Sequence, residues 1–334
     1  MAKKTALVFG ISGQDGSLLA KLLLHKGYLV FGTARDCDLA NFARLKRLSI
    51  FDQVVLRSTS LTDFRSVAQV ISEVRPDEIY NLAGQSSVGL SFDQPVETID
   101  SFVNGTINIL EAVRLLGVQS RFYNASSSEC FGDTGDQRAD EETPFRPCSP
   151  YGVGKAAAHW LVSNYRDAYG VFACSGILFN HESPLRPARF VTQKIVQGAV
   201  DIAEGKTRTL ELGNLGIKRD WGWAPEYVDA MWRMLHLEVP TDLVIATGHS
   251  HSLQEFVECA FGEVGLNWRE HISTQSRLYR PLEIQSNGAS PQKAFSILGW
   301  AASTDFPTIV KRMIAAEIDQ RRQSQTTSDV LADI

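Results

Sequence analysis

The stretch SPYGVGK, residues 149–155, places Tyr151 four positions before Lys155. Residues four apart lie on one face of a helix, so the ammonium of Lys155 would sit beside the phenol of Tyr151. A neighbouring positive charge favours the phenolate, which would make Tyr151 a usable base for a substrate hydroxyl. The same spacing also occurs in ordinary surface pairs, so its position in the fold decides between the two interpretations.

A second candidate group follows the apolar run SRFY at residues 120–123. It comprises Ser127, Ser128 and Glu129 of the stretch NASSSE, which lies at the carboxyl end of a predicted strand. Ligands bind at that edge in doubly wound sheets, where a serine hydroxyl can hydrogen-bond the reacting oxygen. Oxidation of one carbinol needs only a hydroxyl, a tyrosine and a lysine, so the added carboxylate predicts a second proton transfer. The alternative is that Glu129 only caps or pairs at the end of the strand.

Short apolar runs alternate with helical segments over the first part of the chain, and this pattern must position the candidate groups. Strands buried on both faces are apolar throughout, so the alternation predicts an α/β fold with a Rossmann-type, doubly wound parallel sheet. The predicted strands are 5–10, 28–34, 53–58, 78–83, 120–126 and 172–179, and the predicted connecting helices are 16–26, 64–74, 105–116 and 153–168.

Three glycines with the spacing GxxGxxG, Gly10, Gly13 and Gly16, lie between the first predicted strand and the first predicted helix. Glycine allows a tight turn and a close backbone approach, and the helix N-terminus offers N–H groups to a pyrophosphate. With a second strand at the right distance, this predicts a dinucleotide site rather than a structural turn. Arg35 at the end of that second strand favours NADP, because it can accept a 2′-phosphate. If Arg35 is only a solvated loop residue, Asp36 favours NAD instead.

The apolar pattern loosens after residue 180. Helices are predicted over 191–204, 226–237 and 252–264, and DLVIATG predicts a strand near 242–247 that returns to the main sheet. We therefore expect an NADP-binding domain over residues 1–180 and a smaller C-terminal substrate-binding lobe over most of 181–320. Residues 321–334 are polar without a clear apolar face over their first half, and they are expected to form a flexible tail.

Composition argues against several other classes of function. The 334-residue chain has a formal net charge of -5 and no basic tract, which argues against a nucleic-acid surface. The apolar run near the N-terminus is soon broken by polar residues, so we expect neither a signal peptide nor a membrane span, and a cytoplasmic protein. The five cysteines are scattered without CxxC spacing, which predicts reduced thiols and no metal site.

With these residues in place, the sequence resembles the extended short-chain dehydrogenase/reductases that modify nucleotide sugars, and among them the GDP-mannose 4,6-dehydratase family. The similarity runs over nearly the whole chain and is most specific in GILFNHESP, residues 176–184, and KRDWG, residues 218–222. It implies a tightly bound NADP, a GDP-sugar substrate, and a homodimer or homotetramer in which the loop after Arg35 helps to complete a neighbour's cofactor site.

The resemblance also implies roles for the catalytic candidates. Tyr151, tuned by Lys155, would be the base at the C4 hydroxyl, and Glu129 would remove the C5 proton while water leaves C6. The hydride taken from C4 by NADP returns to C6, so the net redox change is zero. Ser128 matches a family serine, whereas Ser127 stands where the family usually has threonine and keeps the hydroxyl.

The binding residues implied by the resemblance come from both halves of the chain. Departures from the family pattern occur at Asp36, at Ser60 in place of an aspartate, and at Gln285 in place of an acid. The predicted cofactor residues are Gly10, Ser12, Gly13, Gln14, Asp15, Gly16, Arg35, Ser60, Leu61, Leu82, Ala83, Gln85, Tyr151, Lys155 and His181. The predicted substrate residues are Ser87, Asn180, Glu182, Arg186, Lys194, Lys218, Arg219, Arg280 and Glu283.

GDP-mannose is the expected substrate, and three alternatives remain open. The first is a dehydratase of a related GDP-sugar such as a heptose, and the second is an NADPH-dependent reductase of a GDP-4-keto-6-deoxy sugar. Glu129 discriminates against the reductase, which needs no base at C5. The third is a dinucleotide-binding protein without catalysis, which would have no use for Tyr151, Lys155 and Glu129 together.

Overall fold

Seven parallel strands form the main sheet of the structure, a computed structural model that describes residues 3–332 and the side chains of residues 3–323. Their order is β11-β7-β5-β4-β1-β2-β3, so the chain runs outward from β1 on one side and then continues on the other. This is the predicted doubly wound α/β fold. The strands are β1 (Thr5–Phe9), β2 (Leu29–Ala34), β3 (Val55–Ser58), β4 (Glu78–Asn81), β5 (Arg121–Ser127), β7 (Ala173–Leu178) and β11 (Leu243–Ile245).

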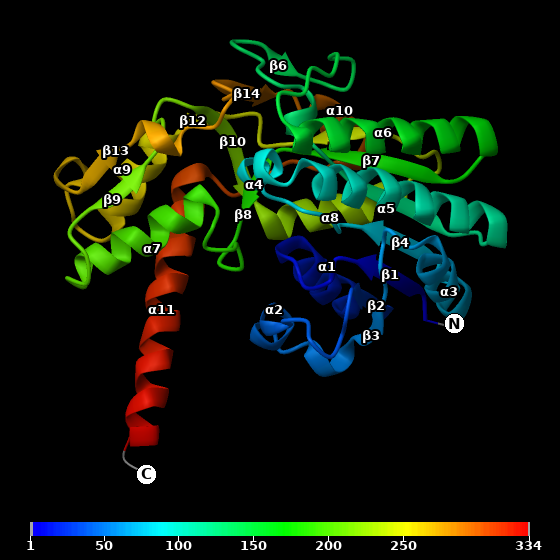
Figure 1. Ribbon diagram of the computed structural model, residues 1–334, viewed down its shortest axis with the longest axis horizontal. Coiled ribbons are helices and arrows are strands. Elements are labelled where there is room, and N and C mark those ends of the chain that lie inside the picture. Colours follow the sequence, from blue (N-terminus) through cyan, green and yellow to red (C-terminus); the bar gives the residue numbers. More distant parts are fainter. Residues whose placement is uncertain (1–2, 333–334) are drawn as a thin grey trace.

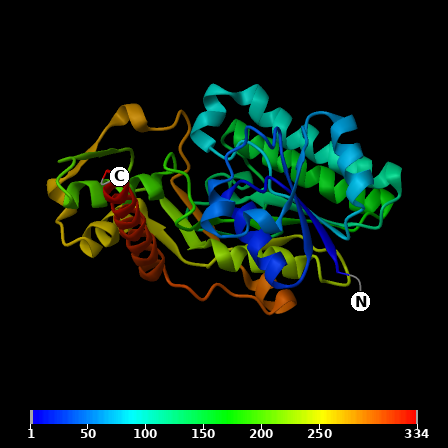
Figure 2. The same cartoon turned by 90° about the horizontal axis from the view of Figure 1, so that it is seen from below.

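Helices cover both faces of this sheet, as Figures 1 and 2 show. Successive side chains of a strand point to opposite faces. Leu7 and Phe9 accordingly pack with α3, α5 and α6, whereas Ala6 and Val8 pack in the core that α1 and α8 share. Burial on both faces explains why the strands are apolar throughout. The helices are α1 (Gln14–His25), α3 (Phe64–Val74), α5 (Pro95–Leu116), α6 (Pro150–Tyr169) and α8 (Ala224–Met234).

Helix α5 differs most from its prediction, because it begins at Pro95 rather than near residue 105. Proline suits the first turn of a helix, where its missing N–H loses no bond. The first turns of α5 expose Val96 to solvent and so lack the buried apolar stripe that marks the later turns. The shorter helices are α2 (Ala43–Arg47), α4 (Val88–Asp93), α10 (Gln292–Leu298) and the 3-10 turns η1 (Phe51–Gln53), η2 (Ser128–Cys130), η3 (Trp268–Glu270) and η4 (Ser276–Leu278).

The C-terminal lobe is built on a second, smaller sheet with the order β12-β10-β14-β6, in which β8 also pairs with β10. Strand β6 comes from the loop after β5, so the lobe also draws on the chain before residue 180. The strands are β6 (Arg138–Ala139), β8 (Asn180–Glu182), β10 (Lys218–Trp223), β12 (Ser250–Ser252) and β14 (Ser286–Ala289), with β9 (Leu210–Leu212) and β13 (Ile272–Thr274) as a separate pair.

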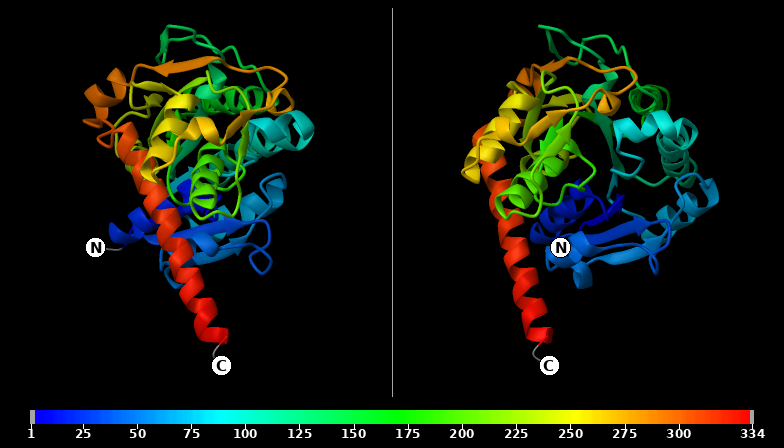
Figure 3. Two further views of the ribbon diagram at one scale, coloured as in Figure 1. Left: turned by 90° about the vertical axis from the view of Figure 1, so that its left-hand side faces the viewer. Right: turned by 60° about the vertical axis from the view of Figure 1, so that its left-hand side comes forward.

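Three helices, α7 (Val191–Ala203), α9 (Leu253–Glu263) and α11 (Phe306–Ala332), enclose the core of the lobe. Trp221 and Phe256 lie in this core beside the start of α11. Helix α11 then extends beyond the rest of the molecule (Figures 1 and 3).

The predicted tail begins inside helix α11. Arg321, the first residue of the predicted tail, forms ion pairs with Asp201, Glu204 and Glu317 at 2.7 to 2.9 Å. The chain therefore remains helical and anchored at Arg321 instead of becoming irregular there. Among the described residues, no helix is long and apolar enough to cross a membrane.

Candidate active site

The turn after β1 leaves no room for side chains at two of its glycines. Gly10 has φ 84°, and a Cβ there would lie 2.8 Å from the amide nitrogen of Ala83. A Cβ on Gly16 would collide with the carbonyl oxygen of Gly10. Helix α1 starts at Gln14, and its N-cap residue Gly13 provides no side-chain cap, so backbone N–H groups face the turn. This narrow turn and helix start fit the predicted dinucleotide pyrophosphate.

A buried ion pair joins the first turn of α1 to β8. Oδ2 of Asp15 lies 2.9 Å from Nε2 of His181, and Nδ1 of His181 lies 2.7 Å from the carbonyl oxygen of Phe179. Burial acts to raise the pKa of Asp15, but the charge and hydrogen bond of His181 lower it to about 2. Burial acts to lower the pKa of His181, and Asp15 outweighs burial and raises it.

Gln14 strengthens the same junction between the two halves of the molecule. Its Nε2 donates to the carbonyl oxygen of His181 at 3.2 Å, and its Oε1 accepts from the hydroxyl of Ser183 at 2.9 Å. Three predicted cofactor residues, Gln14, Asp15 and His181, therefore couple the glycine turn to the C-terminal lobe.

The loop after β2 carries the two residues that bear on cofactor choice. Arg35 is exposed directly after the strand. Oδ1 of Asp36 accepts from the backbone N–H groups of Asp38 at 2.9 Å and Leu39 at 3.2 Å. The Asp36 carboxylate thus closes its own turn, which reduces its availability to a ribose hydroxyl.

The loops after β3 and β4 carry the other predicted cofactor residues of the first half. Hydrogen bonds to the backbone position two of these. The carbonyl oxygen of Leu61 accepts from the side-chain Nδ2 of Asn108 at 2.7 Å, and the N–H of Leu82 donates to the carbonyl oxygen of Phe9 at 3.0 Å. Both loops follow carboxyl ends of strands in the same sheet as β1, since β4 lies beside β1 and β3 lies beside β2. This is the edge where doubly wound sheets bind ligands. The residues in these loops are Ser60, Leu61, Leu82, Ala83 and Gln85.

Tyr151 and Lys155 lie on the first turns of α6, beside the end of β5. Nζ of Lys155 donates to the carbonyl oxygen of Ala125 at 2.7 Å and lies 4.2 Å from the ring centroid of Phe102. Burial lowers the pKa of Lys155 to about 8. Burial also raises the pKa of Tyr151, and a hydrogen bond with Ser127 lowers it only in part. The expected shift toward phenolate is absent here, because burial disfavours the charged phenolate. The ammonium of Lys155 is directed at Ala125 and lies 5.9 Å from the phenol ring centroid.

The structure distinguishes between the two candidate serines. The hydroxyl of Ser127 acts on the phenol of Tyr151, whose pKa it lowers in part, and it accepts from the N–H of Glu129 at 3.3 Å. Ser128 instead makes its contact through its carbonyl oxygen, which accepts from Asn287 at 3.1 Å. Ser127 is therefore the serine that faces the tyrosine, and it brings Tyr151 and Glu129 to one point.

Glu129 belongs to a row of alternating charges that we call the charged row: Glu129, Arg280, Glu283 and Arg219. Nη1 of Arg280 lies 3.8 Å from Oε1 of Glu129 and 3.6 Å from Oε1 of Glu283. Oε1 of Glu283 in turn lies 3.6 Å from Nη2 of Arg219. The row connects the end of β5 with β10 and the loop before β14. It therefore brings three predicted substrate residues to the predicted catalytic carboxylate.

Glu182 and Arg186 form a second pair in the lobe. Nε of Arg186 lies 3.3 Å from Oε2 of Glu182, which also accepts from the hydroxyl of Thr192 at 2.8 Å. Burial raises the pKa of Glu182. Asn180 begins β8 and pairs in register with Trp221 of β10.

The remaining predicted substrate residues are Lys194, Lys218 and Ser87. Nζ of Lys194 donates to the carbonyl oxygen of Glu211 at 2.7 Å, and Lys218 begins β10 with its side chain exposed. Ser87 caps helix α4. Within residues 3–323, no hydrogen bond or ion pair joins these three side chains to Glu129 or Tyr151.

Sequence reasoning missed several residues that support the site. Nδ2 of Asn287 donates to the carbonyl oxygens of Ser128 and Gly132, both at 3.1 Å, and so fixes the turn that carries Glu129. Nη1 of Arg44 donates to the carbonyl oxygen of Ser12 at 3.0 Å, beside the glycine turn. These contacts join distant segments, so no local spacing signals them. The departure from the family pattern at Gln285, two residues before Asn287, is the nearest hint.

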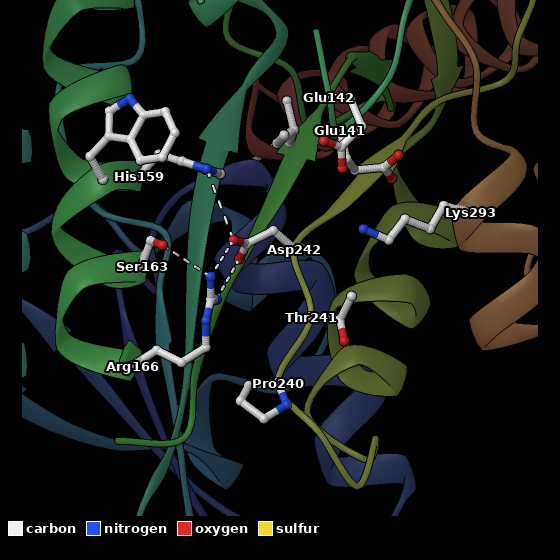
Figure 4. Close-up of a pocket in the computed structure, with 11 residues that line it drawn as sticks. Glu141, Glu142, His159, Ser163, Arg166, Pro240, Thr241, Asp242 and Lys293 are labelled. Carbon is white, nitrogen blue, oxygen red and sulfur yellow. Dashed lines mark hydrogen bonds and ion pairs between the residues drawn. The ribbon is translucent and has the colours of Figure 1, made fainter. Parts of the chain in front are cut away.

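A cavity of about 280 Å³ lies away from this site, beside the edge strand β11. Figure 4 shows His159 and Arg166 of α6 facing Asp242, with Lys293 on the opposite wall. Arg166 donates to both carboxylate oxygens of Asp242, at 3.0 and 2.8 Å. The cavity is lined by none of the predicted site residues, so the candidate chemistry belongs to the end of β5.

Comparison with known proteins identifies the family. The model of the family described as GDP-mannose 4,6 dehydratase matches residues 7–313. GDP-mannose 4,6 dehydratases 1 and 2 of Arabidopsis thaliana are 42% and 43% identical over 337 residues, covering 98% of this chain and 93% and 90% of theirs. The solved UDP-glucose 4-epimerase of Thermus thermophilus, in complex with NAD, confirms the fold: its TM-score is 0.82 at 24% identity, covering 94% of this chain and 98% of that chain. The chain belongs to the GDP-mannose 4,6-dehydratase family.

Proposed function

We propose that this protein converts GDP-mannose to GDP-4-keto-6-deoxymannose, with loss of one water. The observation that carries the proposal is the meeting of Tyr151 and Glu129 at Ser127, whose hydroxyl contacts the phenol and the backbone N–H of Glu129. A dehydration with internal hydride transfer needs one group to move the proton of a hydroxyl and another to move a proton from carbon. A phenol and a carboxylate in one site meet that need.

Each catalytic side chain has a defined task in this reaction. NADP bound at the glycine turn supplies a hydride acceptor that also returns the hydride. The phenol oxygen of Tyr151 takes the proton of the C4 hydroxyl, which Ser127 orients. Lys155 holds its ammonium on the carbonyl oxygen of Ala125, 5.9 Å from the phenol ring centroid. The carboxylate of Glu129 takes the C5 proton, made acidic by a ketone at C4, as water leaves C6.

NADP is the proposed dinucleotide, in preference to NAD. Support comes from Arg35, which is exposed at the end of β2, where a 2′-phosphate is recognised in this fold. Further support comes from Asp36, whose carboxylate is engaged by two backbone N–H groups of its own turn.

A homodimer that forms through α5 and α6, or a tetramer built from such dimers, is the proposed assembly. Support comes from the exposed apolar side chains of Val96 on α5 and Val153 on α6, which are 81% and 47% exposed. The proposed location is the cytoplasm, which fits five cysteines that are all free thiols.

The purified protein, mixed with GDP-mannose and a catalytic amount of NADP⁺, tests the proposed reaction. Mass spectrometry of the nucleotide sugar should show loss of one water, and absorbance should show no accumulation of NADPH. Net consumption of NADPH with a GDP-4-keto-6-deoxy sugar, and no dehydration, would instead indicate the reductase. Dehydration of another GDP-sugar, such as a heptose, but not of GDP-mannose would correct the substrate.

A further inference from the structure

Arg280 is the most weakly held cation of the charged row. Its Nη1 lies between two carboxylates, 3.8 Å from Glu129 and 3.6 Å from Glu283. Neither distance is that of a hydrogen bond, and Arg280 makes no side-chain hydrogen bond within residues 3–323. A guanidinium carries five N–H donors and can bind an oxyanion with two of them. Arg280 therefore retains donors for an anionic ligand.

The neighbouring members of the row are also incompletely paired. Arg219 is 4% exposed, and its Nη1 donates to the carbonyl oxygens of Lys218 and Ile284. Its Nη2 and the Oε1 of Glu283 are buried without a hydrogen-bond partner among the described residues. A buried donor without an acceptor is costly, so Nη2 of Arg219 gains stability when an oxyanion accepts from it. Oε1 of Glu283 is itself an acceptor and gains no partner from an oxyanion.

We propose that Arg280 is a positioning residue that holds the carboxylate of Glu129 until the diphosphate of the nucleotide sugar draws the guanidinium away. This inference rests on the proposed function. A diphosphate offers more negative charge and more acceptor oxygens than one carboxylate, so it competes well for Arg280 and Arg219. The two ligands of Arg280, Glu129 and the diphosphate, would then be alternatives rather than simultaneous partners.

The consequence lies in the timing of catalysis. While Arg280 lies beside Glu129, Oε1 of the carboxylate is paired with the guanidinium, 3.8 Å from its Nη1. When Arg280 moves to the diphosphate, Glu129 becomes free to take the C5 proton, and this happens only with the nucleotide in place. Binding energy from a remote part of the substrate is thereby used at the reacting centre.

Binding of GDP alone, measured by calorimetry on the NADP-loaded protein, tests the competition without chemistry. We expect Glu129→Gln to bind GDP about 3- to 10-fold more tightly, because Arg280 no longer has to leave a carboxylate. Arg280→Gln should bind GDP about 10- to 100-fold more weakly. In the Arg280→Gln background, Glu129→Gln should change the affinity by less than about twofold.

The double variant separates this competition from simple repulsion between Glu129 and the diphosphate. Repulsion does not need Arg280. If Glu129→Gln raised GDP affinity equally in the unmodified protein and in the Arg280→Gln variant, the proposal would be overturned. Glu142→Gln removes one exposed carboxylate outside the charged row and should leave GDP affinity unchanged. Arg280→Lys keeps the positive charge and should recover most of the coupling with Glu129.

Steady-state kinetics with GDP-mannose give an independent readout. Arg280→Gln should raise KM about tenfold or more, with kcat falling less than about threefold, because Glu129 is free in the bound state either way. A large loss of kcat would mean that Arg280 must stay beside Glu129, and would overturn the proposal. The unmodified protein could dehydrate GDP-mannose normally while Glu129→Gln changes GDP affinity equally with and without Arg280. That result refutes only this inference. If the protein neither binds GDP nor dehydrates GDP-mannose, the proposed function fails as well.

Discussion

Asp15 and His181, 166 residues apart in sequence, are joined at 2.9 Å between Oδ2 and Nε2. Asp15 belongs to the helix start at the glycine turn, and His181 belongs to the strand that leads into the lobe. His181 also stacks on Tyr227 with ring centroids 4.6 Å apart, so its ring is held from two sides. The pair therefore connects the part of the molecule that would hold the dinucleotide to the part that would hold the sugar nucleotide.

Loss of this pair should destabilise the protein in a pH-dependent way. Asp15 raises the pKa of His181 above its unfolded value, so the native state binds the proton more tightly. That stabilisation is complete below about pH 6.5 and is lost as pH rises through the native pKa. His181→Gln should therefore lower the free energy of unfolding by about 3 kcal/mol at pH 6, and by less at higher pH. Denaturant unfolding across this pH range checks it, with His249→Gln, an exposed histidine, as the control. A loss of unfolding free energy that does not change with pH would contradict the raised pKa of His181.

Glu129→Gln should abolish dehydration while leaving cofactor binding intact. The amide has nearly the shape of the carboxylate but cannot take a proton from C5, so we expect kcat to fall about 1000-fold. Mass spectrometry measures water loss, and NADP binding is measured by calorimetry on the same preparation. Normal turnover by this variant would remove Glu129 from the mechanism.

Arg35→Ser should change cofactor preference. Loss of a charged hydrogen-bond donor to the 2′-phosphate should weaken NADP binding about 10- to 100-fold and change NAD binding by less than about threefold. Affinities for both dinucleotides, titrated separately, check this. Arg208→Ser removes an exposed arginine of the lobe and serves as the control. Equal weakening of both dinucleotides would show that Arg35 does not read the phosphate.

Lys155→Met should stabilise the protein at neutral pH although it removes activity. Burial lowers the native pKa of Lys155 from 10.5 to about 8, so the unfolded state binds this proton more tightly. The cost of holding the charge, about 3 kcal/mol, is present below pH 8 and disappears as pH rises toward 10.5. Part of the gain is offset by the lost hydrogen bond to Ala125.

Thermal melts of the Lys155→Met variant at pH 7 and pH 10 measure this effect. The melting temperature should exceed that of the unmodified protein at pH 7, and the difference should shrink at pH 10. Lys21→Met, at an exposed lysine on α1, should show neither effect. A Lys155→Met variant less stable at both pH values would mean that burial of this charge carries little cost.

Val96→Asp should dissociate the proposed dimer. Val96 is 81% exposed on α5, and a buried, unpaired carboxylate at an interface is strongly unfavourable. Light scattering coupled to size exclusion should show a smaller species than the unmodified protein. Val239→Asp alters a valine that is 68% exposed outside α5 and α6, and it should leave the mass unchanged. An unchanged mass for Val96→Asp would exclude this part of α5 from the interface.

Local patterns in the sequence were enough to predict the fold and many residues of the candidate site. The glycine spacing, the apolar runs and the four-residue step from Tyr151 to Lys155 each reflect the geometry of one turn, strand or helix, so they are visible without coordinates. Helix α5 began earlier than predicted because its first turns lack that periodic signal.

Residue types and their spacing were therefore enough to predict the doubly wound sheet, the place of Ser127 and Glu129 at the end of a strand, and the family resemblance. The packing of distant segments was needed to show that Ser127 rather than Ser128 acts on Tyr151, and that Arg280 lies 3.8 Å from Glu129. The same packing brings Asn287, 159 residues from Ser128, to the turn that carries Glu129. Such contacts depend on how the two sheets and their connecting loops pack, and residue spacing along the chain carries no record of that packing.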